Sequence, residues 1–507
     1  MQTMKSRNNL FTSKNSTLLY FVIFFAALFL YAATCAPGPL WQDAGMYQYR
    51  IWHNDIEGKL GLALSHPLYH IIGIAVKYIP IGEFAYRINM ISAVAGALAI
   101  ANLFLLLRLW LGRNPGAILA AITLAVSWTH WQFAAVAEVY TLYSALFLAE
   151  LIFLLGYVQT KRVSFLYLLG LFNGLAIAVH MFASIGFICY LVFLIVLLTK
   201  KQISLKHFAV ITFLWVAGAS SYEYLIIKNI IQSGDFSGTI ASALFGNTWQ
   251  GAVLNINLSA RVIKENIIFM AYNFATPNVF LFFAGLYRLK KFARSRGFGN
   301  IILALLVLFF LFAFRYTVPD RYSFFMPFYC IASILIGLGF DVLIIKPNRR
   351  VMTYLVFIAS FTTIPVYIAA PIAAQKTGFK LPTRREIPYR NDYNWFLRPW
   401  QSGNKGPEQF ANEVFSTVQH DAVIYADGTT VYPLLYLQQV KGVHKDVIIA
   451  TGHGSANNLN KYGEDAIDRL FSEHAIYVVS PVPGYCPEFL LARYKFDKAG
   501  ILWRAVE

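Results

Sequence analysis

The chain has 507 residues, of which 58% are hydrophobic and only 13% are charged, and its mean hydropathy is +0.54. This composition excludes an ordinary soluble globular domain and indicates that lipid is the main solvent. The formal net charge of +17 does not indicate a nucleic-acid partner, because Lys and Arg stand in short clusters between apolar runs, as in membrane proteins. The cysteines contain no CxxC pair, so they indicate neither a disulfide framework nor a zinc site.

The first apolar run, about residues 18–33, follows Lys5, Arg7 and Lys14 and lacks a small-residue cleavage site. We expect it to be an uncleaved membrane span with the N-terminus in the cytoplasm. Further apolar runs bring the expected total to about eleven transmembrane helices. They cover residues 85–107, 116–130, 138–158, 164–180, 183–199, 207–227, 267–287, 299–316, 322–344 and 352–372.

The charge bias of the loops agrees with this count, because every loop that the count places inside is basic. The clusters are Arg108 and Arg113; Lys161 and Arg162; Lys200, Lys201 and Lys206; Arg288, Lys290, Lys291, Arg294 and Arg296; and Lys346, Arg349 and Arg350. An odd number of spans then leaves the C-terminus outside. Within the long first outer loop, residues 36–84, the stretch 68–80 is too short to span and ends at Pro80, so we expect an interfacial helix there.

The last part of the chain differs in composition from the rest. After Pro371 the sequence turns polar, and from about residue 421 strand and helix patterns alternate. We therefore expect a membrane domain over residues 1–373 and a small extracytoplasmic α/β domain over residues 374–507. The Asp427-Gly428 pair at a strand end fits a turn better than a binding site.

Ionisable and aromatic side chains gather in the segments that the topology places outside, where they suggest an active site at the membrane surface. They come from four separate stretches of the chain: Asp43, Asp55, Glu57 and His66; Trp128, His130, Trp131, Glu138 and Tyr140; His180; and Arg315, Asp320, Arg321 and Tyr322.

A structural role is open for each of these residues. Asp43 fits a solvated residue near a helix end, and His66 before Pro67 fits a helix cap. Glu138 fits a pairing with an arginine, and His180 fits a satisfied structural histidine. Arg321 suits either lipid headgroups or the phosphate of an anionic substrate.

The order of these residues and their neighbours resembles a known family. An Asp in the first outer loop is followed by HP, AYRINMISAV, AEVYTL, GLAIAVHM and DRYSFFMPF, and by the tail segment AVIYADGTTVYPLLYLQQVKGVHKDVIIA. This order is similar to that of bacterial and animal membrane proteins related to protein O-mannosyltransferases, within the GT-C superfamily. The resemblance covers most of the chain, and it rests on several weak motifs in the right order.

The resemblance implies a GT-C fold and transfer of a sugar, mannose or another hexose, from a polyprenyl-phosphate carrier to a protein or glycan acceptor, with inversion. It implies that Asp43 is the general base and that His66 and Glu138 line the same cavity. Arg321 and His180 are then expected near the donor phosphate, with Tyr140, Trp128 and Tyr322 as further substrate-binding residues. The family often has D-x-x-E after the first span, whereas this chain has Asp43-Ala44-Gly45-Met46, which leaves Asp55 and Glu57 as alternative metal ligands.

The chemistry agrees with such a donor. The sequence has no GxxxxGK[ST] loop and no Rossmann fingerprint, which argues against ATP or a nucleotide sugar. A lipid monophosphate needs less charge neutralisation than a nucleoside diphosphate, so a divalent metal is optional and no other cofactor is expected. Membrane lipids are expected partners, and nucleic acid is not. A transporter or flippase of lipid-linked sugars, and a non-catalytic receptor with a ligand-binding tail, are the alternatives.

Overall fold

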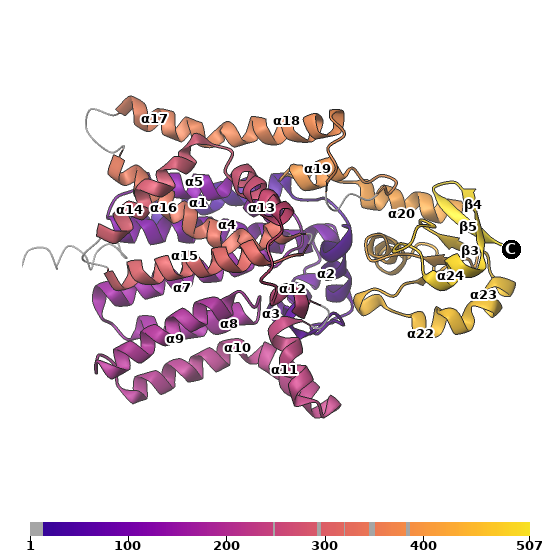
Figure 1. The fold of residues 1–507 in the computed structure, drawn as a ribbon, viewed down its shortest axis with the longest axis horizontal. Helices are drawn as coiled ribbons and strands as arrows, with labels where there is room; N and C mark the ends of the chain where they lie inside the picture. Colours follow the sequence, from indigo (N-terminus) through magenta and orange to yellow (C-terminus); the bar gives the residue numbers. More distant parts are fainter. Residues whose placement is uncertain (1–13, 247–248, 292–295, 319, 344–349, 382–385) are drawn as a thin grey trace, which may run out of the picture.

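A computed structural model describes residues 14–246, 249–291, 296–318, 320–343, 350–381 and 386–507. The basic residues Lys5, Arg7, Arg294, Lys346 and Arg349 lie outside the described residues. Long helices run side by side in a bundle, and a smaller α/β part lies at one end of it (Figure 1). The chain is therefore a polytopic helical membrane protein with a small C-terminal sheet.

Seven of the described helical segments are long and apolar enough to cross a membrane. The number rises to nine if each of two bent helix pairs is counted as one span. They are α1 (Lys14–Thr34), α4 (Phe84–Leu111), α7 (Tyr140–Thr160), α10 (Leu205–Ser233), α15 (Arg296–Arg315), η4 with α16 (Arg321–Phe325 and Met326–Leu343), and α17, η6 and α18 (Arg350–Ala359, Ser360–Thr362 and Thr363–Lys376). Two further expected spans are the shorter apolar helices α8 (Ser164–Ile177) and α9 (Ala183–Thr199). Length and composition alone thus support fewer spans than the eleven expected.

Two expected straight spans are broken, which corrects the sequence interpretation. Residues 116–130 form α5 (Pro115–Ala125) and α6 (Trp128–Ala134), which meet at 66° because Ser127 between them has an extended backbone. Residues 267–287 belong to α13 (Ala260–Asn273), η2 (Pro277–Phe280) and α14 (Leu281–Lys291), with a bend of 109°. A proline at the start of η2 cannot donate the backbone hydrogen bond that would continue the preceding helix.

The long loop after α1, residues 36–84, is folded into short helices. It holds α2 (Gln42–Trp52), η1 (Leu62–Leu64) and α3 (Pro67–Lys77), and α3 is the short helix expected over residues 68–80. Helix α2 lies at the end of the bundle that carries the α/β part (Figure 1). Three further helices, α11 (Phe236–Phe245), α12 (Gln250–Val253) and the start of α13, follow α10.

The C-terminal part contains a five-stranded sheet of order β2-β1-β3-β5-β4. Strands β1 (Val423–Tyr425), β2 (Ile448–Ala450) and β3 (Ile476–Val478) are parallel, and β4 (Lys495–Ala499) and β5 (Leu502–Val506) form an antiparallel hairpin beside β3. Its helical segments are α20 (Gly406–Thr417), α21 (Val431–Leu435), η7 (Tyr436–Val440), η8 (Gly454–Ala456), α22 (Leu459–Tyr462), η9 (Glu464–Ala466), α23 (Ile467–Glu473) and α24 (Glu488–Arg493). The Asp427-Gly428 pair forms a turn before α21, in which the Asp427 carboxylate accepts hydrogen bonds from the backbone and hydroxyl of Thr430.

A segment that we call the strap, residues 386–397, joins the helical bundle to the α/β part. Helix α19 (Asp392–Leu397) lies between α18 and α20, and three side chains of the membrane domain hold its backbone carbonyls. Trp128 donates to Phe396, Gln132 to Trp395 and Tyr272 to Leu397. These donors come from α6 and α13, so one helix of each of the two bent pairs holds the strap.

Candidate active site

Asp43 occupies the first turn of α2, where a carboxylate is favoured by the helix dipole. Its side chain is accessible to solvent, yet protein atoms surround it as densely as they surround a core residue. The carboxylate is thus open to solvent although many protein atoms lie around it. No hydrogen bond or ion pair joins it to another described residue, and burial raises its pKa. Asp43 is therefore available to a ligand.

Two further acids from distant parts of the chain lie near Asp43. Glu138 stands between α6 and α7, and Asp320 stands just before η4. Burial, and then the charges of Asp43 and Asp320, raise the pKa of Glu138 well above its usual range. Burial and the charge of Asp43 raise the pKa of Asp320 to about 6. The three carboxylates thus interact electrostatically, and ionisation of one makes ionisation of the others less favourable.

Two histidines form the other side of this site. The rings of His66 and His180 stack with centroids 5.2 Å apart. His66 Nδ1 lies 2.7 Å from the carbonyl oxygen of Val179, so it donates, and Nε2 carries a lone pair. His180 Nδ1 accepts the backbone N–H of Phe182 at 3.1 Å, so in the neutral ring Nε2 carries the proton. Burial lowers the pKa of His66 to about 4 and that of His180 well below its usual range, which keeps both rings neutral at pH 7.

Tyr47 and Tyr140 connect the acids to the histidines. The Tyr47 and His66 rings lie edge to face, with their centroids 6.0 Å apart. Burial raises the pKa of Tyr47, and the charges of Glu138 and Asp43 raise it further. The Tyr140 ring lies 5.6 Å from His180, and its hydroxyl is hydrogen-bonded to Ser323 at 3.0 Å. We call the set of Asp43, Tyr47, His66, Glu138, Tyr140, His180 and Asp320 the outer cluster.

Trp128 and Tyr322, which we expected to bind substrate, are both buried in the structure. The Trp128 side chain is 3% exposed, and its only donor is used by the carbonyl of Phe396 in the strap. Tyr322 is 7% exposed and stacks on Trp128 at 4.7 Å and on Phe133 at 5.7 Å. Both rings form a packed wall behind the outer cluster, because the strap covers the aromatic residues of α6.

Arg321, which we expected near the donor phosphate, has several protein partners. Its guanidinium forms an ion pair with Glu265 of α13, donates to the Asn266 amide oxygen at 2.9 Å and to the Val318 carbonyl at 3.3 Å, and lies over the Phe269 ring. The residue is 5% exposed. Arg321 is therefore held by α13, and its contact with a donor phosphate stays a prediction. Its acidic partner Glu265 lies on α13, a segment that the sequence analysis does not connect with the site.

Asp55 and Glu57, the alternative metal ligands, each have a cationic protein partner. Burial raises the pKa of Asp55, but hydrogen bonds from Ser455 and Gly58 and the charge of Arg50 hold it below its usual range. The Glu57 carboxylate lies 2.6 Å from Lys228 Nζ and 2.7 Å from the Asn229 amide. The two neighbouring acids thus turn to different cationic partners. Among the residues that the structure describes, no group of three or more His, Cys, Asp or Glu side chains is arranged to hold a metal ion.

Sequence reasoning missed three participants. Asp320 was seen beside Arg321 but given no role, because the arginine seemed the better match for a phosphate. Tyr47 and Tyr432 carried no signal, since a tyrosine in an aromatic-rich chain is unremarkable. A periodic reading of α2 would have placed Asp43, Tyr47 and Arg50 on one face, at spacings of four and three residues.

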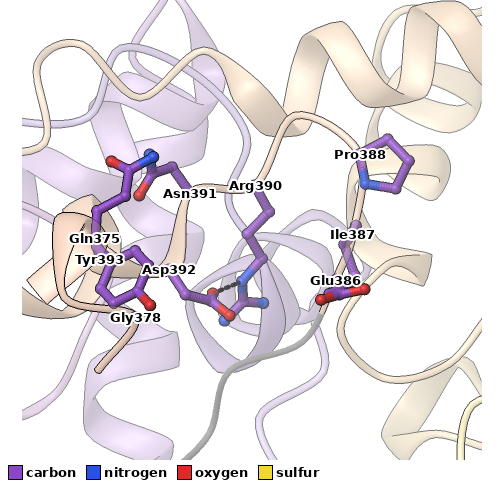
Figure 2. A pocket seen from close by; sticks show the side chains of 9 residues that line it. All are labelled: Gln375, Gly378, Glu386, Ile387, Pro388, Arg390, Asn391, Asp392 and Tyr393. Atoms are coloured by element: carbon purple, nitrogen blue, oxygen red, sulfur yellow. Dashed lines mark hydrogen bonds and ion pairs between the residues drawn. The ribbon is translucent and has the colours of Figure 1, made fainter. Parts of the chain in front are cut away.

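A separate hollow of about 500 Å³ lies between the end of α18 and the strap (Figure 2). Its lining includes Gln375, Glu386 and the pair formed by Arg390 and Asp392, whose charged atoms are 2.5 Å apart. Arg390 also donates to the Gln42 amide oxygen at 3.0 Å. The strap is thereby tied to the residue that precedes Asp43.

Comparison with known proteins agrees with the sequence resemblance. Residues 63–204 match the family model for the N-terminal domain of protein O-mannosyl-transferase TMEM260. That stretch holds His66, Glu138 and His180 but neither Asp43 nor Asp320. Over 181 residues the chain is 26% identical to the mouse protein O-mannosyl-transferase TMEM260, a match that covers 34% of this chain and 26% of the mouse protein. The chain thus matches about a quarter of that relative's length.

Two solved structures have a similar fold. The structure of ArnT from Cupriavidus metallidurans bound to undecaprenyl phosphate is similar with a TM-score of 0.64 at 13% identity, covering 97% of this chain and 98% of that one. The oligosaccharyltransferase AglB from Archaeoglobus fulgidus, in complex with an inhibitory peptide and a dolichol-phosphate, is similar with a TM-score of 0.51 at 14% identity, covering 92% of this chain and 70% of that one. The fold is therefore of the GT-C type, and the expected resemblance to GT-C and protein O-mannosyltransferase-like proteins is confirmed.

Proposed function

We propose that the chain is a membrane glycosyltransferase that moves a sugar from a polyprenyl-phosphate donor to a hydroxyl of a protein or glycan acceptor on the outer face of the membrane, with inversion. The observation that carries this proposal is the Asp43 carboxylate, which has no hydrogen bond or ion pair to another described residue and lies near Glu138 and Asp320. Tyr47 connects it to the stacked histidines His66 and His180. The GT-C fold and the matched relatives support the same class of reaction. Mannose or another hexose is the proposed sugar.

The proposed reaction is a single displacement at the anomeric carbon. The acceptor oxygen forms a bond to that carbon from the face opposite the phosphate, and the bond between the carbon and the phosphate oxygen breaks, with its electron pair leaving on the phosphate. Asp43 takes the proton of the acceptor hydroxyl. The raised pKa of Asp43 makes its ionised form a stronger base, provided that the carboxylate stays ionised at the working pH.

The other residues of the outer cluster have proposed binding roles. The Nε2–H of His180 can donate a hydrogen bond to a phosphate oxygen, and Nε2 of His66 can accept one from a sugar or acceptor hydroxyl. Glu138, whose pKa is raised, is suited to donate from its protonated form. Stabilising the leaving phosphate with preorganised donors is the main electrostatic contribution that such a site can make.

The proposed orientation places the outer cluster and the α/β domain outside the cytoplasm. The links between α7 and α8 and between α9 and α10 lie at the end of the bundle far from the α/β part (Figure 1). They hold the basic residues Lys161, Arg162, Lys200 and Lys201. The positive-inside rule assigns that end to the cytoplasm. In the same proposal, residues 1–373 form the membrane domain and residues 374–507 the extracytoplasmic domain.

Reconstitution tests the function. Purified protein in liposomes is supplied with radiolabelled polyprenyl-phosphate mannose, or glucose in parallel, together with a mixture of extracytoplasmic proteins and glycans. Label that becomes covalently attached to an acceptor supports a transferase. Movement of the labelled lipid between leaflets without transfer would instead support a flippase, and neither event would leave a ligand-binding receptor.

A further inference from the structure

The α/β domain contacts the outer loop that carries the site. The Asp43-bearing helix α2 packs against α21 and against η8 of that domain, and several polar contacts join the two surfaces. The backbone N–H of Gln42 donates to the Thr429 carbonyl at 3.4 Å. At the other end of α2, His53 Nε2 lies 2.6 Å from the Gln439 amide oxygen. Both ends of α2 are thus held by the domain.

The middle of α2 meets Tyr432 at very close range. A Cβ atom on Gly45 would lie 2.8 Å from the Tyr432 Cβ and 2.3 Å from the Leu40 carbonyl, so only glycine allows this approach. The Tyr432 hydroxyl lies 2.8 Å from His453 Nδ1. Tyr432 thus packs against the backbone of α2 two residues from Asp43. Burial raises the pKa of Tyr432, and the charge of Asp43 adds to this effect.

A second line of contacts leads from the domain to His66. The Ser455 hydroxyl donates to Asp55 Oδ2 at 2.5 Å. The same carboxylate oxygen lies 3.6 Å from Arg50 Nε, and the Arg50 side chain is only 1% exposed. Arg50 then donates to the Ser65 carbonyl at 2.9 Å. Ser65 directly precedes His66.

The segment that Arg50 holds contains a residue with an unfavourable backbone conformation. His66 has φ of 49°, in the left-handed region that a non-glycine residue rarely adopts. Such a conformation persists only where surrounding contacts fix it. The hydrogen bond from Arg50 to Ser65 on one side and that from His66 to Val179 on the other supply these contacts.

We propose that the α/β domain is a positioning part of the active site. Through Tyr432, and through the series of contacts Ser455–Asp55–Arg50–Ser65, it fixes the positions from which Asp43 and His66 face the acceptor and the donor. This inference rests on the proposed function. It assigns the domain a role that is independent of any acceptor binding, because its contacts are with the residues that hold the catalytic side chains. Ser455 and Tyr432 are positioning residues in this sense.

The test compares Ser455→Ala with Ser455→Thr and with Ser472→Ala in the full-length protein. Ser472 lies on α23 of the same domain, is exposed, and donates only within its own helix. We expect Ser455→Ala to lower kcat by about 10-fold to 100-fold at a nearly unchanged KM for the labelled lipid donor, since small misplacements of reacting groups have effects of this size. Ser455→Thr keeps the hydroxyl and restores kcat, and Ser472→Ala matches the wild type.

A measurement that does not need activity separates this inference from the proposed function. Hydrogen exchange of the amides in residues 42–66 should be faster in Ser455→Ala than in the wild type and unchanged in Ser472→Ala. If the wild type transfers no sugar but exchange still rises, the proposed function fails and the contact chain stands. If the wild type is active and Ser455→Ala alters neither kcat nor exchange, the positioning role is overturned.

Discussion

Arg321 and Glu265 form a largely buried ion pair that joins η4 to α13. The pair is completed by Asn266, which accepts from Arg321 Nε at 2.9 Å. Because the guanidinium is satisfied by the protein itself, its main contribution is to hold the turn that carries Asp320 beside the other acids. Removing only one partner of such an ion pair lowers stability, because the other charge stays buried.

Arg321→Ala is therefore expected to act on stability more than on donor binding. Its loss leaves Glu265 paired only with Arg261, whose side chain is mostly exposed. We expect the free energy of unfolding to fall by about 1–3 kcal/mol, measured as a lower apparent Tm of the purified protein. Glu265→Gln should also destabilise the protein, and the double variant should cost less than the sum of the two. A variant of Arg321 that keeps the wild-type Tm but raises KM for the lipid donor would restore the phosphate-binding interpretation.

Asp43→Asn is expected to abolish sugar transfer while the protein stays folded. Asn keeps the shape of the side chain but removes its basicity, which for a general base costs about 100-fold to 10,000-fold in rate. The measurement is the initial rate of transfer from labelled lipid donor, with the apparent Tm recorded beside it. Asp497→Asn, at an exposed position of β4, is the control. Transfer by Asp43→Asn at nearly the wild-type rate would move the role of base to Glu138, Asp55 or Glu57.

Asp320→Asn is expected to stabilise the protein at neutral pH. The folded protein holds the Asp320 proton up to about pH 6, whereas the unfolded chain releases it near 3.8, so ionisation costs stability as the pH rises through that window. The rise from 3.8 to about 6 corresponds to about 3 kcal/mol at pH 7, an upper value because the residue is partly solvated. The variant should thus have a higher apparent Tm than the wild type at pH 7, and the difference should shrink toward pH 4. An equal difference at both values of pH would contradict the raised pKa.

Chelation is expected to leave transfer largely intact. The leaving group of the proposed donor is a monophosphate, and Asp55 and Glu57 are held by Arg50 and Lys228. Rates with EDTA and with added manganese or magnesium should agree to within about twofold. Complete loss of transfer in EDTA, reversed by either metal, would show that a cation bound elsewhere in the site is required.

A topology reporter tests the proposed orientation. An enzyme that is active only outside the cytoplasm, fused after Glu507, should be active, and the same reporter inserted between Lys161 and Arg162 should be silent. The insertion point lies in the short basic link between α7 and α8. Activity of the second fusion and silence of the first would place the outer cluster on the cytoplasmic side.

The sequence by itself determined the features that depend on local composition. Apolar runs of about 20 residues define membrane helices wherever they occur, so α4, α7, α10 and α15 were found almost at their observed bounds. Strand and helix patterns after residue 421 likewise indicated the small sheet. The gathering of Asp43, His66, Glu138 and His180 followed from the order of spans, because alternate loops return to the same face.

Only the tertiary structure decided which of these side chains have partners. Whether Arg321 meets a phosphate or Glu265 depends on how α13 packs against η4, and hydropathy carries no information on that contact. Asp55, Arg50 and Ser455 are separated by up to 405 residues in the chain, and no local pattern brings them together. Asp43 and Asp320 share one environment for the same reason. Pairing of charges and shifts of pKa arise from distances between segments, whereas helix formation in lipid arises from the composition within one segment.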